Sequence, residues 1–234
     1  TVNNMLSLKN IRMIVFDMAG TTLNEGGLVY SSIYNTLTRN NISLDIDELH
    51  EFGGMNKYDV IEHFVNRELS DNHKYKERQL FTSKLYLEFN DTLINNYKTN
   101  DNITVMPGTY ELFSNLKYNN IKIGLNTGYP SSIAKILLNK LQLNSFIDGC
   151  VTSDMVSSGR PERYMIHKLM ADNNITNSNE VIKVGDTLAD IKEGKNAGVK
   201  YSIGVLTGVC NRDDFKRANA DYILDTIYDI NKYL

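Results

Sequence analysis

The stretch IRMIVFDMAGTT, residues 11–22, decides the fold class of this chain. Its first half, Ile11–Phe16, is a short run of apolar and β-branched residues that predicts a buried strand. Asp17 follows at once, and the small and polar residues after it predict a turn. In an open parallel sheet, ligands bind at the carboxyl ends of the strands. Asp17 is therefore a candidate functional residue at the end of a core strand.

Further strands of this kind follow along the chain and alternate with helices. The predicted strands are Ile121–Leu125, Phe146–Val151 and Val181–Val184, with two more at Tyr201–Leu206 and Tyr222–Leu224. The helices, marked by apolar residues three and four positions apart, are Tyr110–Lys117, Ile133–Leu141, Tyr164–Met170 and Ala189–Gly198. Alternating strands and helices predict an α/β fold with a parallel sheet covered on both faces.

Residues 28–97 interrupt this alternation, because they contain no convincing strand. Apolar residues at helical spacing form three stripes there, and the longest runs from Tyr75 to Tyr97. The two crossings, Glu25–Gly27 and Asn95–Asn102, are rich in glycine or asparagine and are expected to be flexible. The sequence thus predicts an inserted α-helical cap domain, residues 25–99, that opens and closes over a Rossmann-like core formed by residues 1–24 and 100–234.

The composition is typical of a soluble globular protein. Of 234 residues, 41% are hydrophobic, and 25 Lys and Arg against 28 Asp and Glu give a formal net charge of −3. This lack of a basic surplus argues against nucleic acid or an anionic membrane as a partner. No apolar run approaches the ~20 residues that span a bilayer, and Thr1–Asn10 lacks the charged-then-apolar order of a signal peptide. Because Cys150 and Cys210 match no metal or disulfide pattern, we expect a cytoplasmic protein.

Polar or charged residues at the ends of the predicted strands could converge on one crevice of the sheet. They are Asp17, Thr127, Ser153–Asp154, Arg160 and Asp186. Each also has an ordinary structural interpretation: Asp17 as a turn cap, Thr127 as a turn residue, Arg160 as half of a surface ion pair. Thr187 and Asp190 have the spacing of a capping box, which needs no catalytic role. The common position of these residues at strand ends favours a shared functional site.

Four motifs in this order resemble those of the haloacid dehalogenase (HAD) superfamily of hydrolases. Asp17–Thr22 is similar to its first motif, and Leu125–Gly128 is similar to its second, in which a hydroxyl residue ends a strand. Arg160, before a proline, is similar to the cationic third motif, and Gly185–Asp190 resembles the acidic fourth. The ordered set spans residues 11 to about 206. The resemblance therefore implies that the whole core is that of a HAD hydrolase.

Within the superfamily, the chain is similar to the phosphonatase branch. Ala19 stands in a D-x-A-G-T motif like that of phosphonoacetaldehyde hydrolases, where most HAD phosphatases carry a second aspartate. Ile121–Tyr129, Ser158–Pro161 and Val184–Gly198 also match that branch. The segment Gly54–Lys57 resembles the phosphonatase loop that presents a Schiff-base lysine.

The resemblance implies a Mg²⁺-dependent phosphoryl transfer at Asp17. Asp17, Asp186 and the carbonyl of Ala19 would be the protein ligands of Mg²⁺, a hard cation that suits sparse oxygen ligation. Asp190 lies four residues after Asp186, which would place both on one helical face, and it would support the metal indirectly or through water. With its other oxygen, Asp17 would attack phosphorus and form an aspartyl phosphate.

The same resemblance assigns residues to the substrate. Thr127 and nearby backbone N–H groups would bind the equatorial oxygens of the phosphoryl group, and Arg160 would add a fixed positive charge and forked donors. The predicted substrate-binding residues are Ala19, Gly20, Thr21, Gly128 and Lys57. The phosphoryl contacts would serve any phosphoryl transfer, so they say little about the leaving group.

Ala19 and Lys57 bear on the leaving group. Ala19 cannot protonate an alkoxide, whereas a carbon leaving group needs an electron sink, which a lysine iminium provides. Asn56 is a predicted N-cap that places Lys57 at the first helical position, where the helix dipole and burial would lower the pKa of the amine. Lys57 could instead be an exposed cap lysine, or a cation that grips a substrate phosphate or hydroxyl.

Two departures from the phosphonatase pattern leave the substrate open. Val60 stands where phosphonoacetaldehyde hydrolases typically carry a histidine, and Leu23–Tyr30 resembles an uncharacterised phosphonatase-like subgroup. We predict a Mg²⁺-dependent hydrolase that cleaves the P–C bond of phosphonoacetaldehyde or a related small phosphonate. The alternatives are a phosphatase for a small phosphate monoester and a vestigial phosphate-ligand binding protein. The sequence is also compatible with a homodimer.

Overall fold

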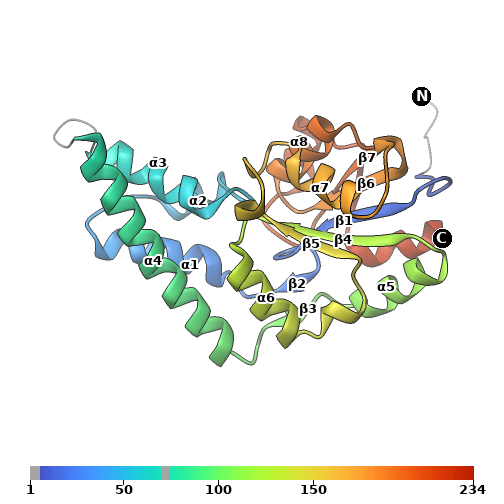
Figure 1. The fold of residues 1–234 in the computed structure, drawn as a ribbon, viewed down its shortest axis with the longest axis horizontal. Coiled ribbons are helices and arrows are strands. Elements are labelled where there is room, and N and C mark those ends of the chain that lie inside the picture. The colour runs from blue at the N-terminus through green and yellow to red at the C-terminus, as the bar shows by residue number, and fades with distance from the viewer. Residues whose placement is uncertain (1–5, 70–73) are drawn as a thin grey trace.

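The computed structural model describes residues 6–69 and 74–234 and has two parts, an α/β core and a helical cap (Figure 1). The core holds a six-stranded sheet in the order β5-β4-β1-β6-β7-β8, in which every neighbouring pair is parallel. These strands are β1 Met13–Asp17, β4 Lys122–Thr127, β5 Gly149–Thr152, β6 Val181–Gly185, β7 Tyr201–Val205 and β8 Tyr222–Leu224. The predicted α/β fold with a parallel sheet is confirmed.

Strand β1 lies in the middle of the sheet and is buried on both faces. Met13 and Val15 belong to a cluster with residues of α7, while Ile14 and Phe16 belong to a cluster with residues of α5 and α6. Figure 1 accordingly shows α7 and α8 on one side of the sheet and α5 and α6 on the other. The core helices are α5 Thr109–Tyr118, α6 Ser131–Lys140, α7 Tyr164–Asp172, α8 Leu188–Ala197 and α9 Arg212–Arg217. Short 3-10 helices are Leu143–Ser145, Ser153–Met155, Ser178–Glu180 and Ile227–Tyr233.

The cap, within the described residues, consists of α1 Leu28–Arg39, α2 Ile46–His50, α3 Lys57–Leu69 and α4 Tyr75–Thr99. Helix α4 packs across α1 and α3 (Figure 1). The buried residues of α4 are Thr82, Leu85, Phe89, Leu93 and Tyr97, three or four positions apart. The helical insertion is therefore confirmed, although Tyr75, at the start of the predicted stripe, is exposed.

The crossings between core and cap differ in part from expectation. Strand β2, Leu23–Asn24, pairs antiparallel with β3, Thr104–Val105, and this ribbon was not predicted. Helix α4 continues to Thr99, so the first part of the predicted hinge at 95–102 is helical. Tyr97 in this part is fully buried, and its packing stabilises the last turns of the helix. On the outgoing crossing, Gly26 and Gly27 have φ of 67° and 74°, which glycine adopts without strain.

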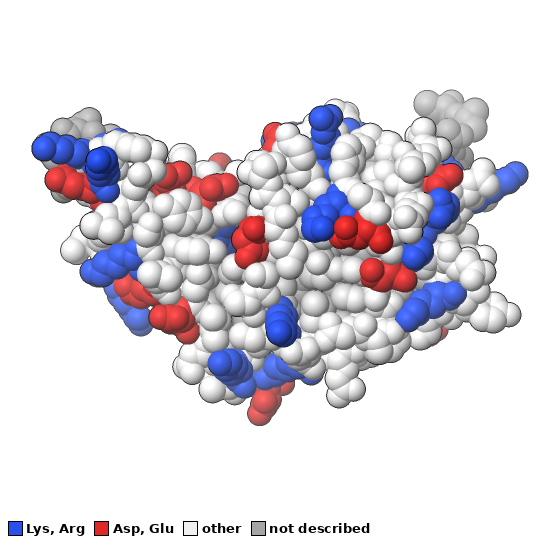
Figure 2. Space-filling view, viewed as in Figure 1, with Lys and Arg blue, Asp and Glu red and all other residues white. Residues whose placement is uncertain are grey.

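Figure 2 shows Lys and Arg interspersed with Asp and Glu on the face in view. Among the described residues, no helix is long and apolar enough to cross a membrane. Buried charged side chains are rare in proteins and need partners. In the described part of this chain they are Asp17, Glu25, Lys57, Arg160, Lys183, Asp186, Asp190 and Glu193. Four of them, Asp17, Glu25, Lys57 and Asp186, line one cavity between the cap and the carboxyl edge of the sheet, and the other four are linked to Asp17 by ion pairs with Arg160 at their centre.

Candidate active site

A cavity of about 370 Å³ lies between the cap and the carboxyl ends of the strands. The core lines it with Asp17, Ala19, Gly20, Thr127, Gly128 and Asp186, and the cap with Glu25, Tyr30, His50, Gly54 and Lys57. Thr21, Arg160 and Asp190 lie one layer behind this lining and contact it through ionic or hydrogen-bonded partners. The residues predicted from four separate motifs therefore meet at one place.

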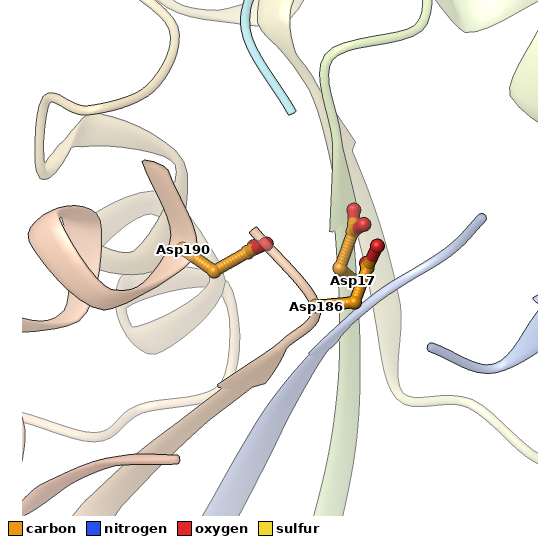
Figure 3. Close-up of side chains that lie close together, drawn as sticks. All are labelled: Asp17, Asp186 and Asp190. Atoms are coloured by element: carbon orange, nitrogen blue, oxygen red, sulfur yellow. The ribbon is translucent and has the colours of Figure 1, made fainter. Parts of the chain in front are cut away.

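Asp17 and Asp186 lie side by side, because β1 and β6 are neighbours in the sheet (Figure 3). Asp190 approaches them from helix α8. Carboxylate oxygens of the three residues lie within 4.8 Å of one another. The convergence was predicted, but the reason given for Asp190 was wrong: Asp186 precedes α8, which begins at Leu188, so the two do not share a helical face.

The three aspartates form a group that could hold a metal ion. Burial raises the pKa of Asp186 well above its usual range, and the charges of Asp17 and Asp190 raise it further. Thr21 Oγ1 and the Val209 N–H donate to Asp186 at 2.9 and 3.1 Å, so its carboxylate is held in place. A hard divalent cation prefers carboxylate oxygens as ligands, and it would offset the repulsion between these three carboxylates. The site thus fits Mg²⁺ chemically.

Arg160 is the centre of a buried ionic network and not half of a surface ion pair. Its Nη2 donates to Asp17 Oδ1 at 2.8 Å, and its Nε donates to Glu193 Oε2 at 3.0 Å. Its Nη1 lies 3.2 Å from Asp190 Oδ1. Burial acts to lower the pKa of Arg160, but the surrounding carboxylates outweigh it and raise the pKa. The guanidinium therefore stays charged and fixes the orientation of Asp17.

Lys183 and Glu193 complete this network, and the sequence reasoning missed both. Lys183 Nζ lies 2.9 Å from Asp190 Oδ1 and donates to Asn126 Oδ1 at 2.6 Å. Burial alone would raise the pKa of Asp190, but Arg160 and Lys183 beside it lower the pKa overall. A lysine inside the apolar run Val181–Val184 was the available signal, since a charge in a buried strand needs a partner.

Two other strand-end residues differ in what they do. Thr127 is buried at the end of β4 and its hydroxyl accepts the N–H of Tyr129, so it faces the cavity in a fixed position. Asp154, by contrast, is exposed and accepts the N–H and hydroxyl of Ser131 at the start of α6. The expectation that Asp154 joins the crevice is therefore wrong, because its hydrogen bonds serve a helix end. The predicted capping box of Thr187 and Asp190 is confirmed at α8.

Gly128 marks a close approach of cap and core. A Cβ atom there would lie 2.3 Å from the Met55 carbonyl oxygen and 2.7 Å from that of Gly54. Both obstacles are backbone atoms of the cap loop that carries Lys57, so they cannot move aside as a side chain would. The absence of a side chain at position 128 lets this loop reach the end of the cavity that Asp17 lines.

Gly128→Ala is expected to lower kcat/KM by 10- to 100-fold, on the order of the loss from an ångström of misplacement, because the cap loop must retreat. Gly149→Ala is the matched control, since its Cβ would meet only side-chain atoms of Leu169 and Asn173, at 3.1 and 3.8 Å, and no backbone of the cap. Steady-state kinetics and thermal unfolding of both variants separate misplacement from instability. Equal kcat/KM for Gly128→Ala and wild type would show that this contact does not matter for turnover.

Lys57 is buried at the first position of α3, and Asn56 accepts the Tyr58 N–H at 2.8 Å, as expected for an N-cap. The exposed-lysine alternative is therefore wrong. Burial lowers the pKa of Lys57 to about 8, although Asp17 nearby acts to raise it. The amine donates to the Met55 carbonyl at 3.0 Å. The cavity thus contains an amine that is partly neutral near physiological pH, beside the carboxylate of Asp17.

Comparisons with known proteins agree with this geometry. The family model described as haloacid dehalogenase-like hydrolase matches residues 14–205. Phosphonoacetaldehyde hydrolase of Parabacteroides distasonis is 32% identical over 209 residues, which cover 86% of this chain and 78% of that protein. Phosphonoacetaldehyde hydrolase of Bacillus cereus is 30% identical over 205 residues, covering 85% and 76%.

Solved structures show the same fold. A phosphonoacetaldehyde hydrolase-like protein from Oleispira antarctica superposes with a TM-score of 0.79 at 23% identity, covering 99% of this chain and 94% of that one. A hydrolase from Pseudomonas syringae gives 0.77 at 21% identity, covering 95% and 97%. With the family model spanning the core and the insertion, the chain belongs to the haloacid dehalogenase-like hydrolases.

Proposed function

We propose that the chain is a Mg²⁺-dependent phosphonatase that cleaves the P–C bond of phosphonoacetaldehyde or a related small phosphonate. The observation that carries this proposal is the buried amine of Lys57, with a pKa of about 8, in the same cavity as Asp17. The similarity to phosphonoacetaldehyde hydrolases at about 30% identity supports the substrate class.

In the phosphoryl half of the site, Asp17 is the proposed nucleophile. Asp17, Asp186 and the carbonyl of Ala19 would hold Mg²⁺, with Asp190 supporting them from behind. The bound ion would neutralise the phosphoryl oxygens that otherwise repel a carboxylate. Arg160 orients Asp17 through the 2.8 Å contact, and Thr127 with the adjacent backbone of Gly128 would receive the equatorial oxygens. The N–H groups of Gly20 and Thr21 already donate to the carbonyls of Leu23 and Met18, at 2.9 and 3.2 Å.

In the leaving-group half, Lys57 supplies the electron sink. Its neutral amine adds to the aldehyde carbon, and with one proton taken up and water released the product is a protonated imine. Asp17 then attacks phosphorus, the P–C bond breaks, and its electron pair moves through carbon to the imine nitrogen to leave a neutral enamine. Protonation of the enamine carbon and addition of water release acetaldehyde and restore Lys57. Water also hydrolyses the aspartyl phosphate, which releases phosphate and restores Asp17.

The phosphatase alternative shares Asp17, Thr127 and Arg160 and differs at the leaving group. An alkoxide leaving group needs a proton donor, and Ala19 offers none where HAD phosphatases carry an aspartate. The vestigial binding protein would be favoured by loss of Asp17 or Asp186, and both are present. The geometry therefore supports the phosphonatase best.

Trapping with borohydride tests the proposal. Wild-type protein with Mg²⁺, phosphonoacetaldehyde and borohydride should gain a covalent adduct on Lys57 that mass spectrometry locates. Lys57→Arg, which keeps the charge but cannot form an imine, should gain none, and Lys84→Arg on the cap surface should label like wild type. No adduct on wild type, with phosphate esters still hydrolysed by Lys57→Arg, would establish the phosphatase instead.

The pH dependence of trapping follows from the pKa of Lys57. At pH 7, a pKa of about 8 in place of 10.5 leaves about 300 times more neutral amine. Only the neutral amine adds to an aldehyde, so the trapping rate should rise from pH 6 through pH 8 and level off above it. A rate that still rises steeply between pH 9 and 10 would contradict a buried, perturbed amine.

A further inference from the structure

Glu25 is a cavity-lining carboxylate that takes no part in the proposed reaction. Of the carboxylates that line the cavity, Asp17 and Asp186 belong to the phosphoryl half, whereas Glu25 comes from the first crossing into the cap. Its neighbours in the lining include Tyr30 and Tyr129. Among the described residues it is one of few buried charged groups, with 6% of its surface exposed.

The Glu25 carboxylate is anchored by two direct hydrogen bonds, one of which continues to a third residue. Its Oε2 accepts the Val29 N–H at 2.9 Å, in the first turn of α1, and the Tyr97 hydroxyl at 2.8 Å, near the end of α4. The Tyr97 hydroxyl in turn lies 2.9 Å from the hydroxyl of Tyr129, which follows β4 in the core. Both crossings of the cap and the sheet edge therefore fix this side chain. These hydrogen bonds hold the Glu25 carboxylate in a fixed position in the cavity wall.

Glu25 faces the cavity together with Lys57, and the two charges act on each other. Burial raises the pKa of Glu25, while Lys57 and the donors to its oxygen act to lower it. Glu25 in turn acts to raise the pKa of Lys57. One negative and one positive charge thus offset each other in the leaving-group half. A charged substrate tail would be attracted by one of Glu25 and Lys57 and repelled by the other, and it would lose its water shell on binding.

We propose that Glu25 is a specificity-determining residue that, with Lys57, restricts the substrate to phosphonates or phosphates with a small, polar, uncharged tail. Its carboxylate excludes substrates that carry a second acid group, which Lys57 alone would attract. This role of Glu25 rests on the proposed function in one respect only: the phosphoryl group of the substrate must bind at the Asp17 end of the cavity.

Three non-reacting ligands with one phosphonate head and two-carbon tails test the inference. They are 2-hydroxyethylphosphonate, phosphonoacetate and 2-aminoethylphosphonate, with neutral, anionic and cationic tails. Calorimetric titration at pH 7 with saturating Mg²⁺ gives their dissociation constants. For wild type, the neutral tail should bind about tenfold more tightly than either charged tail, because a charged tail loses its water shell and meets attraction from one group that repulsion from the other offsets.

Substitutions should shift these ratios in opposite directions. Glu25→Gln should favour phosphonoacetate over 2-hydroxyethylphosphonate by about tenfold relative to wild type, because Lys57 is left unopposed. Lys57→Met should favour 2-aminoethylphosphonate over 2-hydroxyethylphosphonate relative to wild type. Glu68→Gln, an exposed cap glutamate outside the cavity, should leave all ratios unchanged. Each ratio is measured on one protein, so a partly unfolded variant does not distort it.

An anion-to-neutral ratio in Glu25→Gln within twofold of wild type would overturn the inference. The proposed function fails separately, through the borohydride experiment, because none of the three ligands has an aldehyde. An adduct on Lys57 with unchanged ratios would leave the phosphonatase standing without this role for Glu25. Shifted ratios without an adduct would assign the same selectivity to a phosphatase.

Discussion

Asp17→Asn is expected to lower kcat on phosphonoacetaldehyde by at least ~10⁴-fold, the scale of loss when a covalent nucleophile is removed. An amide carries no negative charge and cannot form the acyl phosphate. Asparagine has almost the same size, and its oxygen can still accept from Arg160 at the 2.8 Å contact, so the cavity should keep its shape. Phosphate release in the steady state, with acid-quench trapping of phosphoenzyme in wild type, measures the effect.

Asp154→Asn is the matched control for this variant. Asp154 follows the strand next to β4 but is exposed and serves the start of α6. We expect its kcat to stay within about twofold of wild type, as for surface substitutions generally. Mg²⁺-dependent turnover by Asp17→Asn within about tenfold of wild type would contradict a covalent mechanism for phosphonates and phosphate esters alike.

The positions of Asp17 and Asp186 could be predicted because the parallel sheet places the carboxyl ends of its strands at one edge. That rule depends on the order of strands and helices, which apolar periodicity reveals, and not on side-chain detail. The same rule led to the wrong expectation for Asp154. A strand-end aspartate and a helix-capping aspartate look alike in the sequence, and only the position of Ser131 distinguishes them.

The partners of these residues could not be predicted, because they come from distant parts of the chain. Glu25, Tyr97 and Tyr129 form one hydrogen-bonded chain although they lie in the first crossing, in helix α4 and in the core. The sequence predicts Tyr97 in the apolar stripe of a helix, which is correct but says nothing of its hydroxyl. Periodicity identifies which face of a helix is buried. It does not identify the hydrogen-bond partner of a polar group on that face.

Lys183→Met is expected to lower the free energy of unfolding by about 3–5 kcal/mol, the cost of removing one partner from a buried ionic network. Lys183 is fully buried, 2.9 Å from Asp190 Oδ1 and 3.5 Å from Glu193 Oε2. Methionine fills most of the space but leaves two buried carboxylates with Arg160 as their nearby cation. Urea unfolding at pH 7 with a metal chelator measures the loss without a contribution from bound metal.

Two further variants decide whether that loss is ionic. Lys168→Met removes an exposed i,i+4 pair with Asp172, 3.0 Å apart, and should cost about 0.5 kcal/mol or less. Lys183→Met combined with Glu193→Gln removes one of the stranded charges, so the double variant should be more stable than Lys183→Met alone. Burial already raises the pKa of Glu193, and Lys183 acts to lower it. The contrary result is that Lys183→Met loses no more free energy of unfolding than Lys168→Met. Glu193 would then take up a proton when Lys183 is lost. In that case the network would not need fixed charges to hold Arg160 against Asp17.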